Sequence, residues 1–91
     1  MLFLTTYIVK PYLPRSETKK LLELFAKVGE APGTVAHYVA SDNSVGWTIT
    51  ESEDATGGYA ATLQYEEYIQ FETKPVLTME QALPHLLETF Q

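Results

Sequence analysis

The chain has 91 residues, 45% of them hydrophobic, and a net charge of −6 at pH 7; we expect one globular domain spanning residues 1–91. Six basic residues scattered among twelve acidic ones argue against nucleic acid and membrane surfaces as partners, because both bind through clustered Lys and Arg. The absence of cysteine excludes disulfides and thiolate metal sites, and the lack of a signal-peptide pattern favours a cytoplasmic protein.

Residues 2–9 predict a β-strand with two apolar faces, ended by Lys10-Pro11. Its side chains alternate, with Leu2, Leu4 and Ile8 on one side and Phe3, Tyr7 and Val9 on the other. A strand of this kind belongs in the middle of a sheet that is covered on both faces.

A helix is predicted from Ser16, as its N-cap, to Val28. Its apolar residues recur at helical spacing and predict one buried stripe, Leu21, Leu24, Phe25 and Val28. Gly29 is placed to end the helix.

Residues 34–40 and 45–51 predict a β-hairpin joined by residues 41–44, which contain the turn-forming pair Asp42-Asn43. An even-length loop sets three cross-strand pairs: Tyr38 with Trp47, Ala36 with Ile49, and His37 with Thr48. One face of the hairpin is then aromatic and aliphatic, and the other is mixed and polar.

A weaker helix is predicted to open at Ser52-Glu53-Asp54, because acidic residues favour the first turn, although Gly57 and Gly58 weaken it. Residues 69–74 alternate as a half-buried edge strand, closed by Pro75.

The C-terminal residues predict a short helix that starts with a capping box between Thr78 and Gln81. We place Pro84 in its first turn, where proline is tolerated. An apolar stripe follows along the helix, Leu83, Leu86, Leu87 and Phe90.

The order of elements predicts an α+β fold of the ferredoxin-like βαββαβ type, an antiparallel sheet with helices on one face plus a short C-terminal helix. The other face of the sheet stays open, with one apolar side of residues 2–9 on it. Such surface usually marks an interface, so we expect a homodimer that packs sheet on sheet. The C-terminal stripe would pack on its own protomer or across the dimer.

Three blocks of the sequence resemble the small bacterial family known as domain of unknown function 3303. They are residues 1–7 (MLFLTTY), residues 46–51 (GWTITE) with the acidic pair Glu53-Asp54, and residues 71–77 (FETKPVL). The resemblance covers most of the chain and implies a dimeric α/β barrel, with no established activity and no functional residues to carry over. The chain departs from the family pattern at Thr56-Gly57-Gly58, where a better helix former is expected.

His37 is the one candidate catalytic residue, since an imidazole can serve as a general base near neutral pH. The predicted register brings it to the same face as Thr48, and Thr5 or Tyr7 can join them. The simpler interpretation is a half-exposed strand histidine bonded to a hydroxyl group. Neither His37 nor His85 has metal-ligand spacing, and no phosphate or cofactor motif is present, so we expect no metal and no cofactor.

The aromatic residues are the second candidate feature of the site. They either line a ligand cavity or pack in the core and at its rim, as aromatic residues ordinarily do. They would line a cavity between the sheet and the helices, formed by Tyr38, Trp47, Tyr59, Tyr65 and Tyr68. The expected ligand-binding residues are therefore Tyr7, His37, Tyr38, Trp47, Thr48 and Tyr59.

Three functions remain open at this point. The first is a homodimer that binds a small molecule in an aromatic-lined cavity. The second is a cofactor-free isomerase or oxygenase-like enzyme that uses His37 as its base. The third is a protein-interaction module that recruits a partner through an open edge or face of the sheet.

Overall fold

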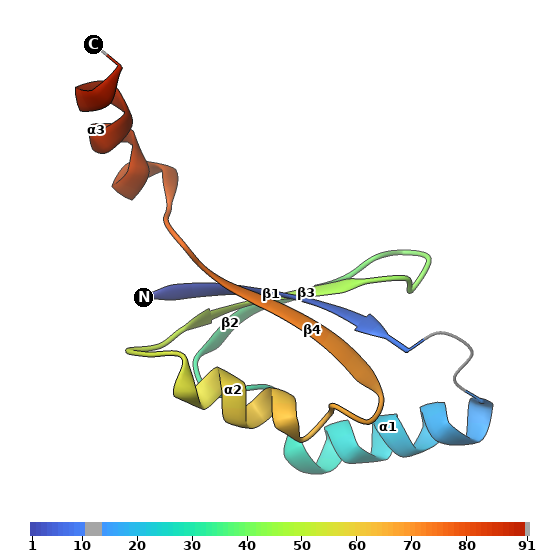
Figure 1. Ribbon diagram of the computed structural model, residues 1–91. Helices are drawn as coiled ribbons and strands as arrows, with labels where there is room; N and C mark the ends of the chain where they lie inside the picture. The colour runs from blue at the N-terminus through green and yellow to red at the C-terminus, as the bar shows by residue number, and fades with distance from the viewer. Residues whose placement is uncertain (11–13, 91) are drawn as a thin grey trace.

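The computed structural model describes residues 1–10 and 14–90. Its strands are β1 (Leu2–Val9), β2 (Thr34–Val39), β3 (Gly46–Glu51) and β4 (Ile69–Val76), and its helices are α1 (Arg15–Val28), α2 (Thr56–Leu63) and α3 (Met79–Thr89). The helices α1 and α2 lie on one side of the antiparallel sheet, and α3 extends away from its end (Figure 1). The predicted ferredoxin-like fold with an added C-terminal helix is confirmed.

Strand β1 lies inside the sheet, whose order is β2-β3-β1-β4. It pairs antiparallel with both β3 and β4, which confirms the prediction from its two apolar faces. The expected end of the strand at Pro11 lies outside the described residues. Strand β4 is at the edge, as predicted, but it continues through Pro75 to Val76. An edge strand has one side without a partner, so a proline that lacks an N–H need not end it.

The β2–β3 hairpin has the predicted register. Ala36 faces Ile49, His37 faces Thr48 and Tyr38 faces Trp47, with a bulge between Thr34 and Ala36. In the turn, Asn43 has a φ of 65°, and the carboxylate of Asp42 accepts bonds from the backbone N–H (3.1 Å) and hydroxyl (2.6 Å) of Ser44. These local bonds explain why the turn residues specified the pairing.

Helix α1 begins at Arg15, one residue before the predicted cap. The carbonyl of Pro14 accepts the N–H groups of Glu17 and Thr18, both at 2.9 Å, and no side chain caps the helix. Ser16 therefore lies within the first turn, and its predicted capping role is wrong. Gly29 ends the helix as predicted, with a φ of 76° and its N–H bonded to the Phe25 carbonyl.

Helix α2 starts at Thr56 rather than at the acidic residues before it. The carboxylate of Asp54 instead accepts the backbone N–H (2.9 Å) and the hydroxyl (2.6 Å) of Thr56. Asp54 thus closes a turn that precedes the helix, which is the local bonding that Asp favours outside helix interiors. Leu21 of α1 forms a small buried core with Tyr65 and Tyr68, which lie between α2 and β4 in the chain.

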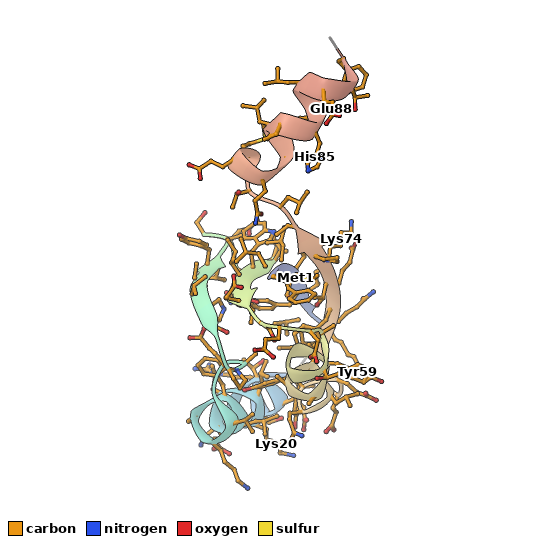
Figure 2. The ribbon with its side chains drawn as sticks, turned by 90° about the vertical axis from the view of Figure 1, so that its left-hand side faces the viewer. Met1, Lys20, Tyr59, Lys74, His85 and Glu88 are labelled. Atoms are coloured by element: carbon orange, nitrogen blue, oxygen red, sulfur yellow. The ribbon has the colours of Figure 1, made fainter. Side chains whose placement is uncertain are left out.

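The capping box of α3 is present, because Thr78 and Gln81 each bond the other's backbone N–H, at 3.1 and 2.9 Å. This box makes Met79 the first helical residue and leaves Pro84 inside the helix, so the predicted first-turn position of Pro84 is wrong. Figure 2 shows α3 standing clear of the sheet, with the side chain of His85 directed outward from the helix. No helix in the described part of the chain is long and apolar enough to cross a bilayer.

Candidate functional site

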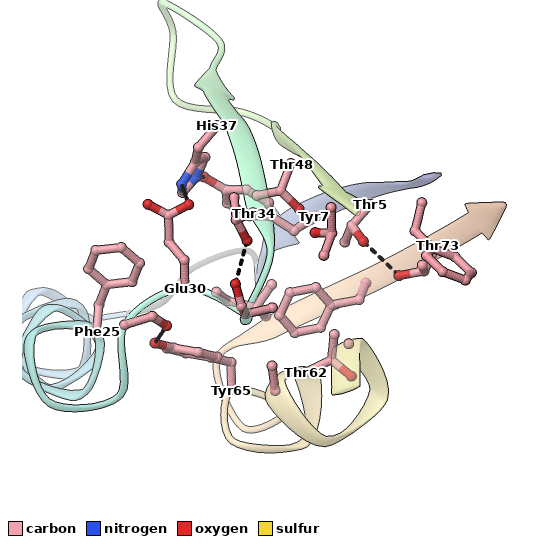
Figure 3. Close-up of a pocket in the computed structure, with 18 of the residues that line it drawn as sticks. Thr5, Tyr7, Phe25, Glu30, Thr34, His37, Thr48, Thr62, Tyr65 and Thr73 are labelled. Carbon is pink, nitrogen blue, oxygen red and sulfur yellow. Dashed lines mark hydrogen bonds and ion pairs between the residues drawn. The ribbon is translucent and has the colours of Figure 1, made fainter. Parts of the chain in front are cut away.

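A cavity of about 530 Å³ lies between the sheet and the two helices that cover it (Figure 3). Its aromatic walls include Phe3, Phe25 and Phe71. Sites for small molecules commonly have this volume and combine apolar walls with a few polar groups.

The polar groups of the cavity form a row across the sheet. Cross-strand pairing sets Thr73 of β4 beside Thr5 of β1, Thr5 beside Thr48 of β3, and Thr48 beside His37 of β2. All four line the cavity, and the hydroxyls of Thr5 and Thr73 are hydrogen-bonded at 2.9 Å. One transverse row therefore supplies three hydroxyls and an imidazole to the same space.

Tyr7 joins this row by reaching over strand β3 to His37. Its hydroxyl lies 2.7 Å from Nε2 of His37, and the two rings meet edge to face with centroids 5.6 Å apart. On the other side of the imidazole, Nδ1 lies 3.5 Å from a carboxylate oxygen of Glu30. Figure 3 shows His37 and the Glu30 carboxylate directed toward each other.

Gly46 leaves the space that the Tyr7 ring needs to reach over β3 to His37. It is the cross-strand partner of Tyr7 and is itself buried. A Cβ at this position would fall on the Tyr7 ring and its hydroxyl oxygen. A side chain at residue 46 would therefore push the phenol away from His37.

The segment that carries Glu30 is held at both ends. The Tyr65 hydroxyl donates a 2.8 Å bond to the carbonyl of Gly29, just before Glu30. Beyond Glu30, the carbonyl of Gly33 accepts the N–H of Glu51 at 3.0 Å. Gly33 has a φ of 83°, and a Cβ there would meet the Glu51 carbonyl. Glycine is thus required for this close approach to β3.

The electrostatic environment keeps Tyr7 protonated. Burial raises the pKa of the Tyr7 phenol above its usual 10.0, and the negative charge of Glu30 raises it further. With the His37 proton on Nδ1, toward Glu30, Nε2 is the ring nitrogen that accepts the Tyr7 hydroxyl hydrogen across the 2.7 Å contact. The His37 side chain is 29% exposed, so solvent reaches it only in part.

The structure brings three of the predicted site residues together. Tyr7, His37 and Thr48 all line the cavity, which confirms that they converge on one face of the sheet. Thr5 and Tyr65, also considered from the sequence, line it too. Glu30 and Thr73 were not anticipated, because no sequence pattern marks either residue; only the turn before β2 and the pairing of β4 bring them here.

The other three predicted residues do not line this cavity, and that placement was wrong. Tyr38 and Trp47 alternate with His37 and Thr48 along their strands, so their side chains lie on the opposite face of the sheet. Tyr59 is exposed on α2 beside a separate shallow hollow. Tyr68 packs in the small core instead. Among the residues that the structure describes, no three acidic or histidine side chains are grouped to hold a metal ion.

Comparison with known families identifies one match, described as "Domain of unknown function (DUF3303)", over residues 1–90. The chain belongs to this family. The resemblance inferred from the three sequence blocks is therefore confirmed. No curated protein matches this DUF3303 chain in sequence.

Several solved structures are similar to the chain at low identity. They include an antibiotic biosynthesis monooxygenase, with 15% identity, a TM-score of 0.47, and coverage of 86% of this chain and 100% of that one. Rv0793 from Mycobacterium tuberculosis has 14% identity and a TM-score of 0.45, covering 85% and 95%. SnoaB, a cofactor-independent oxygenase from Streptomyces nogalater, has 16% identity and a TM-score of 0.41, covering 85% and 92%. At these identities, none indicates what the DUF3303 chain binds.

Proposed function

We propose that this protein binds a small, mostly apolar molecule carrying a hydroxyl or carbonyl group, and that it does so as a homodimer. The observation that carries the proposal is the cavity of about 530 Å³ with a polar row along one wall. Aromatic walls favour burial of a ring or hydrocarbon body. The hydroxyls and the imidazole along the row would fix the orientation of a polar group.

The charged groups of the cavity restrict the charge that the ligand can carry. Glu30 and Asp54 contribute carboxylates to the lining, and Lys10 contributes one ammonium group. The whole chain carries −6 at pH 7. A ligand that arrives as an anion would be repelled, so the proposed ligand does not enter as an anion.

The homodimer proposal depends on the face of the sheet opposite the cavity. Tyr38 is 63% exposed and Ile8 is 43% exposed, and Trp47 lies on the same face by strand alternation. This face has no cover from α1 or α2, which lie on the other side (Figure 1). A second copy with the same apolar face would cover it by two-fold packing.

Helix α3 supports the same assembly. Its apolar stripe does not pack on its own sheet, and Leu86 and Phe90 are 44% and 81% exposed. An amphipathic helix that leaves its own domain needs another surface to bury its apolar side. We assign that surface to the second copy.

Cavity binding can be tested with 1-naphthol as a fluorescent probe. Ala61 of α2 lines the cavity, whereas its neighbour Ala60 does not. Ala61→Phe should therefore weaken naphthol binding about tenfold or more, equivalent to about 1.4 kcal/mol, and Ala60→Phe should leave it unchanged. Equal effects of the two variants, or no binding to the wild type up to millimolar probe, would contradict the proposal.

Assembly can be tested by sedimentation velocity at micromolar concentration. The wild type should sediment at twice the chain mass of 10.2 kDa. Leu86→Glu, which places a charge in the α3 stripe, should give the monomer mass. The control is His85→Glu on the same helix, whose side chain is directed outward and is not part of the apolar stripe. This variant should keep the dimer mass. A monomeric wild type would refute the homodimer.

A further inference from the structure

The chain of side chains from the cavity through Tyr7 and His37 to Glu30 has the form of a proton relay. We infer that this relay takes a proton from a weakly acidic hydroxyl group of the bound molecule, so that the ligand class is a phenol or an enol. This inference rests on the proposed function, because it requires a small molecule in the cavity.

The geometry places a base behind a phenol of the cavity wall. Tyr7 lines the cavity, and its hydroxyl lies 2.7 Å from Nε2 of His37. The Glu30 carboxylate, 3.5 Å from Nδ1, is positioned to stabilise a positive charge on the ring. A hydroxyl group followed by an imidazole and then by a carboxylate is the general arrangement by which proteins activate a hydroxyl group.

The transfer balances without a further reactant. The ligand hydroxyl donates its proton to Oη of Tyr7, while the proton that Tyr7 held passes to Nε2. The O–H bond of the ligand and the original O–H bond of Tyr7 break, and a new O–H bond on Tyr7 and an N–H bond on His37 form. The products are a ligand anion, neutral Tyr7, and an imidazolium beside the Glu30 carboxylate.

The groups around His37 favour this outcome. Tyr7 faces the imidazole from β1, Glu30 from the turn after α1, and Thr48 from the neighbouring strand β3. From α1, the ring of Phe25 approaches edge-on with centroids 6.3 Å apart and brings no charge. Of these neighbours Glu30 is the carboxylate, and the charge of a carboxylate is opposite to that of an imidazolium.

The ligand class follows from the same charges. A carboxylic acid would already be an anion at neutral pH and would meet the acidic lining on entry. An alcohol holds its proton too strongly for an imidazole to remove it. A phenol or an enol enters neutral and has a proton within reach of such a base.

The test uses two probes of nearly the same shape, 4-nitrophenol and its methyl ether 4-nitroanisole. The phenolate of 4-nitrophenol is yellow, so absorbance reports ionisation of the bound probe. In the wild type, bound 4-nitrophenol should stay yellow at pH values where free 4-nitrophenol has lost its colour. Because the proton stays within the complex, this absorbance should change little as the pH falls through that range.

Substitution of the base should lower the anionic fraction of the bound probe. In His37→Gln the ratio of anionic to neutral bound probe should fall about tenfold, the effect of one pKa unit. Tyr7→Phe and Glu30→Gln should lower the same ratio, and circular dichroism checks that each variant folds. If His37→Gln does not fold, the other two variants decide. The ratio is taken over bound probe alone, so a change in affinity does not alter it, and the control Ala60→Phe, outside the cavity, should keep the wild-type ratio.

The outcomes separate the two proposals. If 4-nitroanisole and 4-nitrophenol both fail to bind the wild type, cavity binding itself is refuted. If both bind but bound 4-nitrophenol loses its colour in parallel with the free probe, the relay is refuted and cavity binding stands. Retention of the yellow anion in folded His37→Gln or, where that variant does not fold, in Tyr7→Phe and Glu30→Gln, would also refute the relay.

Discussion

Replacing Gly46 by alanine tests the packing that places Tyr7 beside His37. Gly46 is buried in β3, and a Cβ there would collide with three atoms of the Tyr7 side chain, Cζ, Oη and Cε2. The obstacle is a rigid ring whose hydroxyl is hydrogen-bonded to His37, rather than a flexible chain end. The ring must therefore move, and its hydrogen bond to His37 must lengthen or break.

The expected loss of stability has two parts. Overpacking of a well-filled site costs about 1–3 kcal/mol, and loss of one side-chain hydrogen bond costs about 1 kcal/mol. Gly46→Ala should therefore lower the free energy of unfolding by about 2–4 kcal/mol, measured by urea denaturation. In a Tyr7→Ala background the ring is absent, and the same substitution should cost much less.

Helix α2 offers a matched control. A Cβ at Gly57 or Gly58 meets nothing within 4 Å, and both residues lie inside the helix. Gly57→Ala and Gly58→Ala should each stabilise the protein by about 0.4–1 kcal/mol. The same chemical change thus has opposite signs at the two sites. A Gly46→Ala variant as stable as the wild type would refute the Tyr7 placement.

Three further predictions concern single contacts. Thr78→Ala removes half of the capping box with Gln81 and should lower the free energy of unfolding by about 1 kcal/mol, with reduced helical circular dichroism. Tyr65→Phe leaves the Gly29 carbonyl without its 2.8 Å bond and should cost about 1 kcal/mol in urea denaturation. The folded-state pKa of Tyr7 is raised above 10.0, so the stability from this difference is present below that pH and is lost as pH rises through the folded pKa. Tyr7→Phe should therefore lose less stability than the wild type above pH 10.0; an equal loss would contradict the buried phenol.

The fold was predictable from the sequence where short-range chemistry decides it. The Asp42–Ser44 bonds specify the hairpin turn, and the two apolar faces of residues 2–9 require a central strand. Pro84 was placed wrongly because the capping box, rather than the proline, determines where α3 begins.

The site was predictable in its pairings but not in its orientation. Alternation placed His37 with Thr48 on one face and Tyr38 with Trp47 on the other. Because β1 is apolar on both faces, the pattern could not say which face the helices cover. Glu30 could not be placed from the sequence either, since its position depends on the turn between two glycines with positive φ, Gly29 and Gly33.

Successive side chains of β1 alternate between the cavity and the open face of the sheet. The strand thus contributes to both proposals, ligand binding and dimer formation, through different residues. Phe3, Thr5 and Tyr7 line the cavity, and Leu4, Thr6 and Ile8 project to the open face. A substitution at an even-numbered position therefore changes the open face, which is the proposed dimer surface, without entering the cavity. A substitution at an odd-numbered position changes the cavity wall and leaves the open face unchanged. If both proposals hold, ligand specificity and assembly can vary independently along this one strand.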